Sequence, residues 1–156
     1  MDILSPRARS QRMRAIQSCN TRPEVVLRRA LFKLGLRYRL HRKDLPGTPD
    51  IVLPRYWVAI QVRGCFWHHH SCARGKWPSS REDYWRAKLL GNVRRDRRTD
   101  RALRELGWSV VVVWECALTT PQAVNRKARY VYEMVNSGSE SGGKGRIRGK
   151  TNIFLP

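Results

Sequence analysis

The densest group of chemically reactive side chains in this sequence lies between residues 64 and 72. This segment, GCFWHHHSC, holds two thiols and three imidazoles. Cys65, His70 and Cys72 follow the spacing C-x4-H-x-C, and a fourth thiol, Cys116, lies far along the chain. Three sulfurs and one imidazole form a closed tetrahedral zinc set with no open position for water. The pattern therefore predicts a structural zinc site.

Two points about this cluster stay open at the level of sequence. His68 and His69 compete with His70 for the fourth ligand position, because spacing alone does not choose among three consecutive histidines. An isolated cysteine is usually a small hydrophobic core residue, but the interleaved histidines favour a metal. Cys19 stands apart from the cluster, and we interpret it as a free thiol.

The aromatic residues inside the same segment indicate a second task. Phe66 and Trp67 lie between the expected zinc ligands, so a bound metal would fix the backbone that carries them. Aromatic or apolar wedges on a rigid frame are what proteins insert between DNA base pairs. The alternative, in which these rings merely cover the zinc, is plausible for one of them and less so for both.

The overall charge also indicates nucleic acid. The chain has 156 residues, with 32 Lys and Arg against 12 Asp and Glu, which gives a net charge of +20 and a pI near 11.2. Such an excess favours a polyanionic partner, although charge alone does not exclude a merely basic surface. No apolar run reaches the length of a membrane span, and the N-terminus lacks the apolar core of a signal peptide. We expect a cytoplasmic, nucleoid-associated protein with no membrane partner.

Periodicity predicts the elements that must position these residues. Helices are expected at 21–35, 79–107 and 120–135, the first two with capping-box sequences and the second with a kink near Gly91. Strands are expected at 36–41, 50–53, 56–62 and 108–114, the last a continuous apolar run typical of a buried strand. The order predicts one α/β domain at 21–136, with a mixed central sheet flanked by helices. We expect residues 1–20 to form a basic arm that contacts DNA, and residues 137–156 to form a flexible cationic tail.

Five stretches of the sequence resemble a known family. They are MRAI at 13–16, LPGTPD at 45–50, GCFWH at 64–68, NVRRD at 92–96 and WECAL at 114–118. In this order they resemble the very-short-patch mismatch-repair endonucleases, over about residues 10–118. The resemblance implies a restriction-endonuclease-like fold and a Mg²⁺-dependent enzyme. Such enzymes nick one DNA strand 5′ to the thymine of a T:G mismatch, which arises when 5-methylcytosine deaminates.

The resemblance also implies roles for individual residues. Asp50 would be the metal-binding carboxylate, His68 the catalytic base and Glu24 an assisting group. The zinc set would be Cys65, His70, Cys72 and Cys116. DNA would be contacted by Met13 from the minor-groove side and by the wedge residues Phe66, Trp67 and Trp85 from the major groove.

Several of these residues have simpler explanations when they are read one at a time. A Pro-Asp dipeptide such as the one ending at Asp50 is usually only a turn. Glu24 is explained by its capping-box position, and Trp85 by helix packing. Phosphodiester hydrolysis nevertheless needs a metal to neutralise charge on the phosphate, and histidine is a sensible base near neutral pH.

The chain departs from the best-known branch of the family just before the GC pair. That branch has a Thr-His pair preceded by Phe, whereas this chain has Gln61, Val62 and Arg63. The backbone carbonyl of Val62 retains the ability to bind Mg²⁺. Our hypothesis is that the Gln61 amide oxygen approaches the same ion, the alternative being a tolerated strand substitution. Arg63 would take a lysine-like role on phosphate, because its pKa is too high for proton transfer.

Three functions remain in competition at this level. The first is a T:G-specific nicking endonuclease acting on double-stranded DNA. The second is a nicking nuclease of the same fold for another lesion or a matched site, and the third is a zinc-dependent DNA-binding module without catalysis. The sequence context of the mismatch and any partner methyltransferase or mismatch-repair protein are not evident from the sequence. A monomer is the default expectation.

Overall fold

A mixed five-stranded sheet organises the protein. The computed structural model describes residues 19–137 and 153–155. The strands lie in the order β1 (Arg39–Leu40), β2 (Ile51–Leu53), β3 (Val58–Arg63), β4 (Ser109–Trp114) and β5 (Ile153–Leu155). β1, β2 and β3 pair antiparallel, whereas β3–β4 and β4–β5 pair parallel. The predicted mixed sheet is therefore confirmed.

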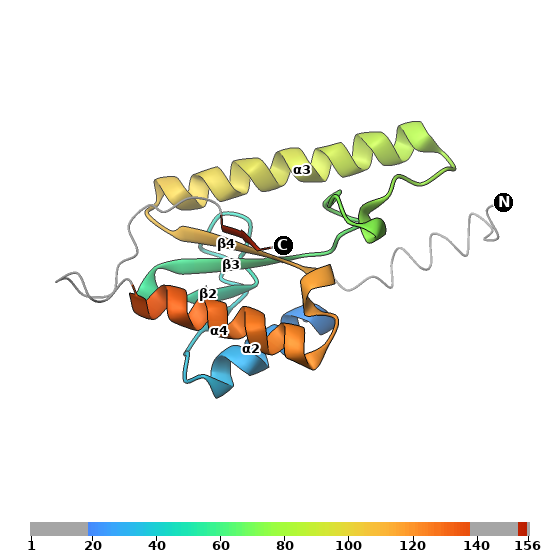
Figure 1. The fold of residues 1–156 in the computed structure, drawn as a ribbon. Helices are drawn as coiled ribbons and strands as arrows, with labels where there is room; N and C mark the ends of the chain where they lie inside the picture. Colours follow the sequence, from blue (N-terminus) through green and yellow to red (C-terminus); the bar gives the residue numbers. More distant parts are fainter. Residues whose placement is uncertain (1–18, 138–152, 156) are drawn as a thin grey trace.

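Three helices cover the two faces of this sheet (Figure 1). α3 (Glu82–Glu105) lies across one face and makes the crossover that parallel β3 and β4 require. α2 (Arg22–Lys33) and α4 (Pro121–Ser137) pack against each other on the opposite face. β4 is buried along its whole length, as its continuous apolar sequence predicts. The expected α/β domain flanked by helices is present.

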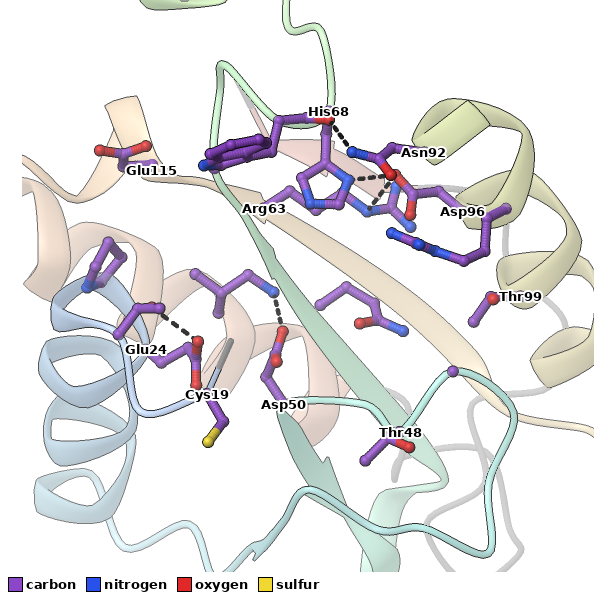
Figure 2. A pocket seen from close by; sticks show the side chains of 18 of the residues that line it. Cys19, Glu24, Thr48, Asp50, Arg63, His68, Asn92, Asp96, Thr99 and Glu115 are labelled. Carbon is purple, nitrogen blue, oxygen red and sulfur yellow. Dashed lines mark hydrogen bonds and ion pairs between the residues drawn. The ribbon is translucent and has the colours of Figure 1, made fainter. Parts of the chain in front are cut away.

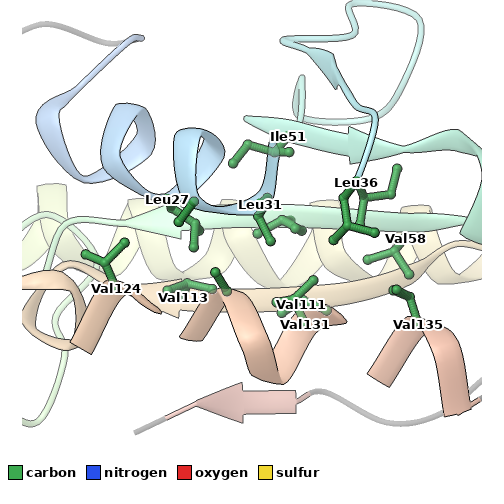
Figure 3. Packing of buried hydrophobic residues seen from close by; sticks show 14 of the residues in the cluster. Leu27, Leu31, Leu36, Ile51, Val58, Val111, Val113, Val124, Val131 and Val135 are labelled. Atoms are coloured by element: carbon green, nitrogen blue, oxygen red, sulfur yellow. The ribbon is translucent and has the colours of Figure 1, made fainter. Parts of the chain in front are cut away.

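Alternation of side chains along the strands divides the core between the two faces. Val58 and Ile60 of β3 pack with Val111 and Val113 of β4 toward α2 and α4 (Figure 3). Their neighbours Ala59, Val110 and Val112 pack toward α3. Side chains of β3 that lie an even number of residues from Ala59 therefore point to the α3 side of the sheet. Arg63, four residues after Ala59, is one of them.

The first predicted strand is much shorter than expected. The sequence predicts a strand at 36–41, but only Arg39–Leu40 is paired. Leu36 donates its backbone N–H to the carbonyl of Leu31 and so belongs to the end of α2, where Gly35 has φ +89°. At the other end His41 has a left-handed φ of 46°, which ends the strand and turns the chain.

The second helix differs from its prediction at the start and in the middle. Its N-cap is Arg81, in a left-handed conformation and without a side-chain cap, so the expected capping box does not form. The helix then runs from Glu82 to Glu105 without interruption at Gly91. A single interior glycine costs a helix only about 1 kcal/mol relative to alanine, which is too little to break a helix of 24 residues.

The two ends of the chain carry the remaining differences. The sequence places residues 137–156 in a tail, whereas Ile153–Leu155 adds a parallel strand to the edge of β4. A short apolar segment can do this because an edge strand offers unpaired backbone groups. Residues 1–18 of the expected DNA-binding arm, Met13 among them, lie outside the described residues. Within the described ranges, no helix has the length and apolar character needed to cross a membrane.

Candidate active site and cysteine–histidine centre

A cleft of about 990 Å³ opens beside the sheet (Figure 2). Its walls are formed by α2, β3 and α3, by the turn that precedes β2 and by the loop that follows β3. Glu24 and Asp50 lie on one side of it, and His68 and Asp96 lie on the other. Residues from four separate parts of the chain therefore face a common space. Three of the four were expected from the sequence, and Asp96 was not.

The acidic side of the cleft is centred on Asp50. Its Oδ2 accepts a hydrogen bond of 2.7 Å from the backbone N–H of Val62, which ties the start of β2 to β3. Burial raises the pKa of Asp50 to about 7, and the nearby charge of Glu24 adds to this shift. A carboxylate that is costly to ionise in a cleft is a candidate functional group, and a cation would relieve the cost.

Glu24 is a buried carboxylate, 3% exposed, at the first turn of α2. It accepts hydrogen bonds from the backbone N–H of Asn20, at 2.9 Å, and from the Thr21 hydroxyl, at 2.7 Å. The expected capping box does not form, because the Thr21 hydroxyl binds Glu24 and caps no backbone N–H, while Glu24 accepts from the N–H of Asn20 and not from that of the N-cap Thr21. The capping sequence thus holds the carboxylate of Glu24 in place beside the cleft.

His41 is a residue of this side that sequence reasoning missed. Its Nε2 lies 3.7 Å from Oε2 of Glu24 and is buried, with no hydrogen-bond partner among the described residues. Ligand atoms of Glu24, His41 and Asp50 all lie within 4.8 Å of one another. A buried, unpartnered nitrogen between two carboxylates is a suitable place for a divalent cation. No pattern of residues close together in the sequence predicts this group, because Glu24 lies in α2, His41 directly follows β1 and Asp50 directly precedes β2.

The opposite side of the cleft holds a histidine–carboxylate pair. Nδ1 of His68 lies 2.5 Å from Oδ2 of Asp96. With its Nδ1 proton donated to Asp96, His68 has a lone pair on Nε2 and can accept a proton there. The backbone around it is held by the bond from His68 N–H to the Gly64 carbonyl and by Asn92 Nδ2, which donates to the Trp67 carbonyl.

A sequence pattern could have identified Asp96 as a candidate site residue. Asn92, Asp96 and Asp100 recur every four residues and so form a polar stripe on one face of α3. Periodicity alone does not say that this stripe faces the histidine loop. The packing of α3 on the sheet decides it.

Arg63 pairs with two acidic residues of α3. Its guanidinium lies 2.6 Å from Asp100 and 3.7 Å from Asp96, and the residue is 7% exposed. Residue 63 is in phase with Ala59, so it faces α3. Arg63 is therefore a buried link between β3 and α3 that also lines the cleft, and its lysine-like role on phosphate stays a prediction. Gln61 and Val62 line the cleft beside Asp50, and their Mg²⁺ roles stay predictions.

The cysteine–histidine centre comes together as the sequence predicted. Ligand atoms of Cys65, His70, Cys72 and Cys116 lie within 4.8 Å of one another, and Cys116 Sγ is 3.5 Å from His70 Nδ1. Burial raises the pKa of Cys65 to about 12, so a thiolate in this position needs a cation beside it. The donor set fits a structural zinc ion. Cys19 is exposed and outside the group.

The structure also chooses among the three histidines. His68 contacts Asp96, while His69 Nδ1 lies 3.1 Å from the Gly75 carbonyl and its ring packs at a tilt against Trp77. Only His70 points its ring into the cysteine group, and it stacks on Trp114 with 4.2 Å between ring centroids. Each histidine of the run therefore has a separate task.

The expected wedge residues form one aromatic cluster. Ring centroids of Phe66 and Trp67 are 5.0 Å apart, and those of Phe66 and Trp85 are 5.3 Å apart. All three rings are half-buried, so the cluster is packed but keeps a face toward solvent. Trp85 comes from the first turn of α3 and is neither a core residue nor isolated. Their contact with DNA stays a prediction.

Comparison with known proteins connects these features to a family. A sequence model described as "DNA mismatch endonuclease Vsr" matches residues 1–74. The chain is 48% identical over 132 residues to the Type II nicking enzyme V.XorIIP of Xanthomonas oryzae pv. oryzae, covering 85% of this chain and 97% of that protein. It is 40% identical over 138 residues to the Type II nicking enzyme V.NmeAIP of Neisseria meningitidis, with 86% and 99% covered. It is 45% identical over 117 residues to the DNA mismatch endonuclease Vsr of Escherichia coli, with 75% of each chain covered.

Proposed function

The chain belongs to the Vsr family of DNA mismatch endonucleases, and from this premise we propose that it nicks one strand of duplex DNA 5′ to the thymine of a T:G mismatch. The observation that carries the proposal is the cleft in which Asp50 and Glu24 face His68 and Asp96. Phosphodiester hydrolysis needs a cation-binding carboxylate and a base for water on opposite sides of one phosphate. The cleft supplies both.

The acidic side would hold Mg²⁺ through Asp50 and the backbone carbonyl of Val62, with Gln61 beside them and Glu24 assisting. When bound, this ion neutralises charge on the phosphate and its leaving group. Asp50 is suited to the task because its bond to Val62 N–H fixes the orientation of its carboxylate. Its raised pKa means that a cation and a proton compete for the same oxygen atoms.

The opposite side would activate water. Asp96 accepts a hydrogen bond from Nδ1–H of His68, holds the ring in one tautomer and stabilises the imidazolium that forms when Nε2 takes a proton. Arg63 and Asp100 stand behind Asp96 and fix its position. In this proposal Arg63 is a positioning residue.

Recognition of the mismatch would fall to the loop and the aromatic cluster. Phe66, Trp67 and Trp85 would enter from the major groove and unstack the T:G pair, at a cost of a few kcal/mol per base step. Zinc on the cysteine–histidine centre would hold this loop, and with it His68. The net charge of +20 would supply salt-dependent contacts with phosphates. The protein would act in the cytoplasm on the nucleoid, as a monomer, with mismatch-repair proteins as candidate partners.

A second function is favoured by the names of two relatives. V.XorIIP and V.NmeAIP are named as nicking enzymes, and their names do not specify a mismatch. A nickase of the same fold for another lesion or a matched site is therefore the alternative. A zinc-dependent binding module without catalysis is disfavoured, because an acidic cluster facing DNA would weaken binding to phosphate.

One experiment separates these functions. End-labelled duplexes carrying T:G, each other mismatch or no mismatch are incubated with the protein in Mg²⁺ or in EDTA. We expect a single nick, only in the T:G duplex, that is lost in EDTA and in Asp50→Ala. The exposed carboxylate variant Asp44→Ala is the matched control and should nick normally. Nicking of another duplex supports the alternative, and tight binding without any cleavage contradicts both enzymatic functions.

A further inference from the structure

His41 has no role in the function proposed above, yet it lines the cleft and has a ring nitrogen within 4.8 Å of carboxylate oxygens of Glu24 and Asp50. We propose that His41 is a third protein ligand of the cation site, with Glu24 and Asp50, and that it gives the site a preference for Mn²⁺ over Mg²⁺. This inference rests on the cation site of the proposed function. It adds a nitrogen donor and a metal preference to that site.

The first support is the unsatisfied nitrogen. Nε2 of His41 is buried and lacks a hydrogen-bond partner within the described ranges, although a carboxylate oxygen of Glu24 lies 3.7 Å away. Buried polar atoms are almost always satisfied, so each exception needs an explanation. A separation of 3.7 Å is too long for a hydrogen bond. It suits two donors on one cation, since ligands at about 2.1 Å from a metal lie about 3 to 4 Å apart.

The second support is the backbone that carries the two residues. Leu40 pairs with Ile51, so His41 and Asp50 are the next residues out on adjacent strands. The N–H of His41 donates to the carbonyl of Asp50 at 3.3 Å, and His41 has a left-handed φ of 46°. This conformation is uncommon for residues other than glycine, although histidine adopts it more readily than most. The turn thus keeps the imidazole next to the carboxylate of Asp50.

The chemistry of the donor atoms indicates which metal ion an added imidazole ligand would favour. Mg²⁺ is a hard cation that takes oxygen ligands and keeps several waters. Imidazole is a better ligand for first-row transition metals, and affinity for nitrogen-containing sites rises from Mn²⁺ onward in the divalent series. Two carboxylates with one imidazole therefore hold Mn²⁺ more firmly than two carboxylates alone, whereas Mg²⁺ gains little. The rival role for His41 is a structural ion pair with Glu24, in which metal affinity would not depend on the ring.

Pulsed electron paramagnetic resonance of bound Mn²⁺ tests this directly, because it detects ¹⁴N coupling from a coordinated imidazole. The full-length protein is used with its cysteine centre loaded with zinc, as verified by metal analysis. We expect one Mn²⁺ with ¹⁴N coupling, lost altogether in Asp50→Asn. In His41→Gln the coupling should disappear and the Kd for Mn²⁺ should rise at least about tenfold, since even outer-shell partners of a metal are worth that much. The Kd for Mg²⁺ should change much less.

Two controls and two contrary results complete the test. Asp44→Asn, three residues along the same turn, should leave the Mn²⁺ affinity and the ¹⁴N coupling unchanged. Thermal unfolding without metal should show that His41→Gln is folded. Absence of Mn²⁺ binding, or of ¹⁴N coupling in the unmodified protein, overturns the inference. If Mn²⁺ binding or ¹⁴N coupling is absent but T:G duplexes are still nicked in an Asp50-dependent way, only the inference fails and the proposed function stands. If ¹⁴N coupling is present but no duplex is nicked, the proposed function fails and the ligand assignment stands.

Discussion

Arg63 and Asp100 form a buried ion pair that joins the sheet to the helix above it. The Nη2 atom of Arg63 lies 2.6 Å from Oδ1 of Asp100, and the two side chains are 9% and 6% exposed. Arg63 also lies 3.7 Å from Asp96, the partner of His68. The pair therefore links the core of the fold to the orientation of the proposed catalytic base.

Loss of one member of this pair should destabilise the protein strongly. Arg63→Met leaves the buried charge of Asp100 without this partner, and Asp100→Asn leaves Arg63 only its longer contact with Asp96. We expect a loss of about 3–5 kcal/mol in the free energy of unfolding. The double variant Arg63→Met/Asp100→Leu should lose much less. Urea denaturation measures all three. The exposed pair Arg101–Glu105 of the same helix is the control, and its removal should have no measurable effect. Single variants as stable as the parent would show that the pair is not an energetic link.

The histidine–carboxylate pair should govern chemistry and not DNA affinity. In Asp96→Asn the ring of His68 loses the acceptor that fixes its tautomer, so we expect the single-turnover nicking rate to fall about 10²-fold or more. The Kd for the T:G duplex should be unchanged. Asp83→Asn, an exposed carboxylate in the first turn of α3, should keep the full rate. An equal rate in Asp96→Asn would remove this pair from the mechanism.

Cation binding should depend on pH through Asp50. Its pKa is raised from 3.8 to about 7 by burial, so the carboxyl is protonated below that pH and must release a proton when a cation binds. Cation affinity should therefore rise from pH 6 to pH 8 and level off above. Calorimetry in buffers of different ionisation enthalpy should detect the proton released below pH 7. An affinity that is flat across this range would contradict the assignment.

The same raised pKa has a consequence for stability without metal. Because the folded state binds the Asp50 proton more tightly than the unfolded state, stability should fall as pH rises from about 4 to about 7. Asp50→Asn cannot ionise, so this variant should be more stable than the parent above pH 7 in EDTA. Saturating cation should reverse the order. Thermal unfolding at pH 5 and pH 8, with and without cation, gives the four required values.

The cysteine–histidine loop should depend on one glycine. A Cβ atom at Gly75 would lie 1.8 Å from the backbone oxygen of His70, so Gly75→Ala should displace that ligand and reduce the zinc content. Loss of zinc should impair T:G recognition and nicking together, because the loop carries both Phe66 and His68. Gly91→Ala in α3 meets nothing within 4 Å and should be neutral or stabilising by up to about 1 kcal/mol. Metal analysis and mismatch binding check both variants.

The aromatic cluster should supply mismatch discrimination. Phe66→Ala or Trp85→Ala removes a ring from the cluster, and we expect the preference for T:G over T:A duplexes to fall while affinity for matched DNA changes little. Tyr130→Ala, an exposed ring on α4, is the control and should keep the preference. Equal loss of binding to both duplexes would assign the cluster to structure instead of recognition.

Features that depend on residues close together in the sequence could be predicted from the sequence. The apolar run at 108–114 predicted β4, and its full burial confirms the interpretation. The spacing of Cys65, His70 and Cys72 predicted a metal-type cluster, and the four expected ligand atoms do lie together. Such patterns survive because hydrophobic alternation and ligand spacing act over a few residues of backbone.

Features that depend on how elements pack were decided only by the tertiary structure. Spacing did not distinguish the three consecutive histidines. In the structure His68 contacts Asp96, His69 contacts Gly75 and His70 contacts the cysteine group. Strand alternation placed Arg63 against α3, where it pairs with Asp100. His41 carried no signal at all, since it meets Glu24 and Asp50 only when β1 pairs with β2 beside the start of α2. Register and packing bring distant side chains within a few ångströms, and no local periodicity encodes those distances.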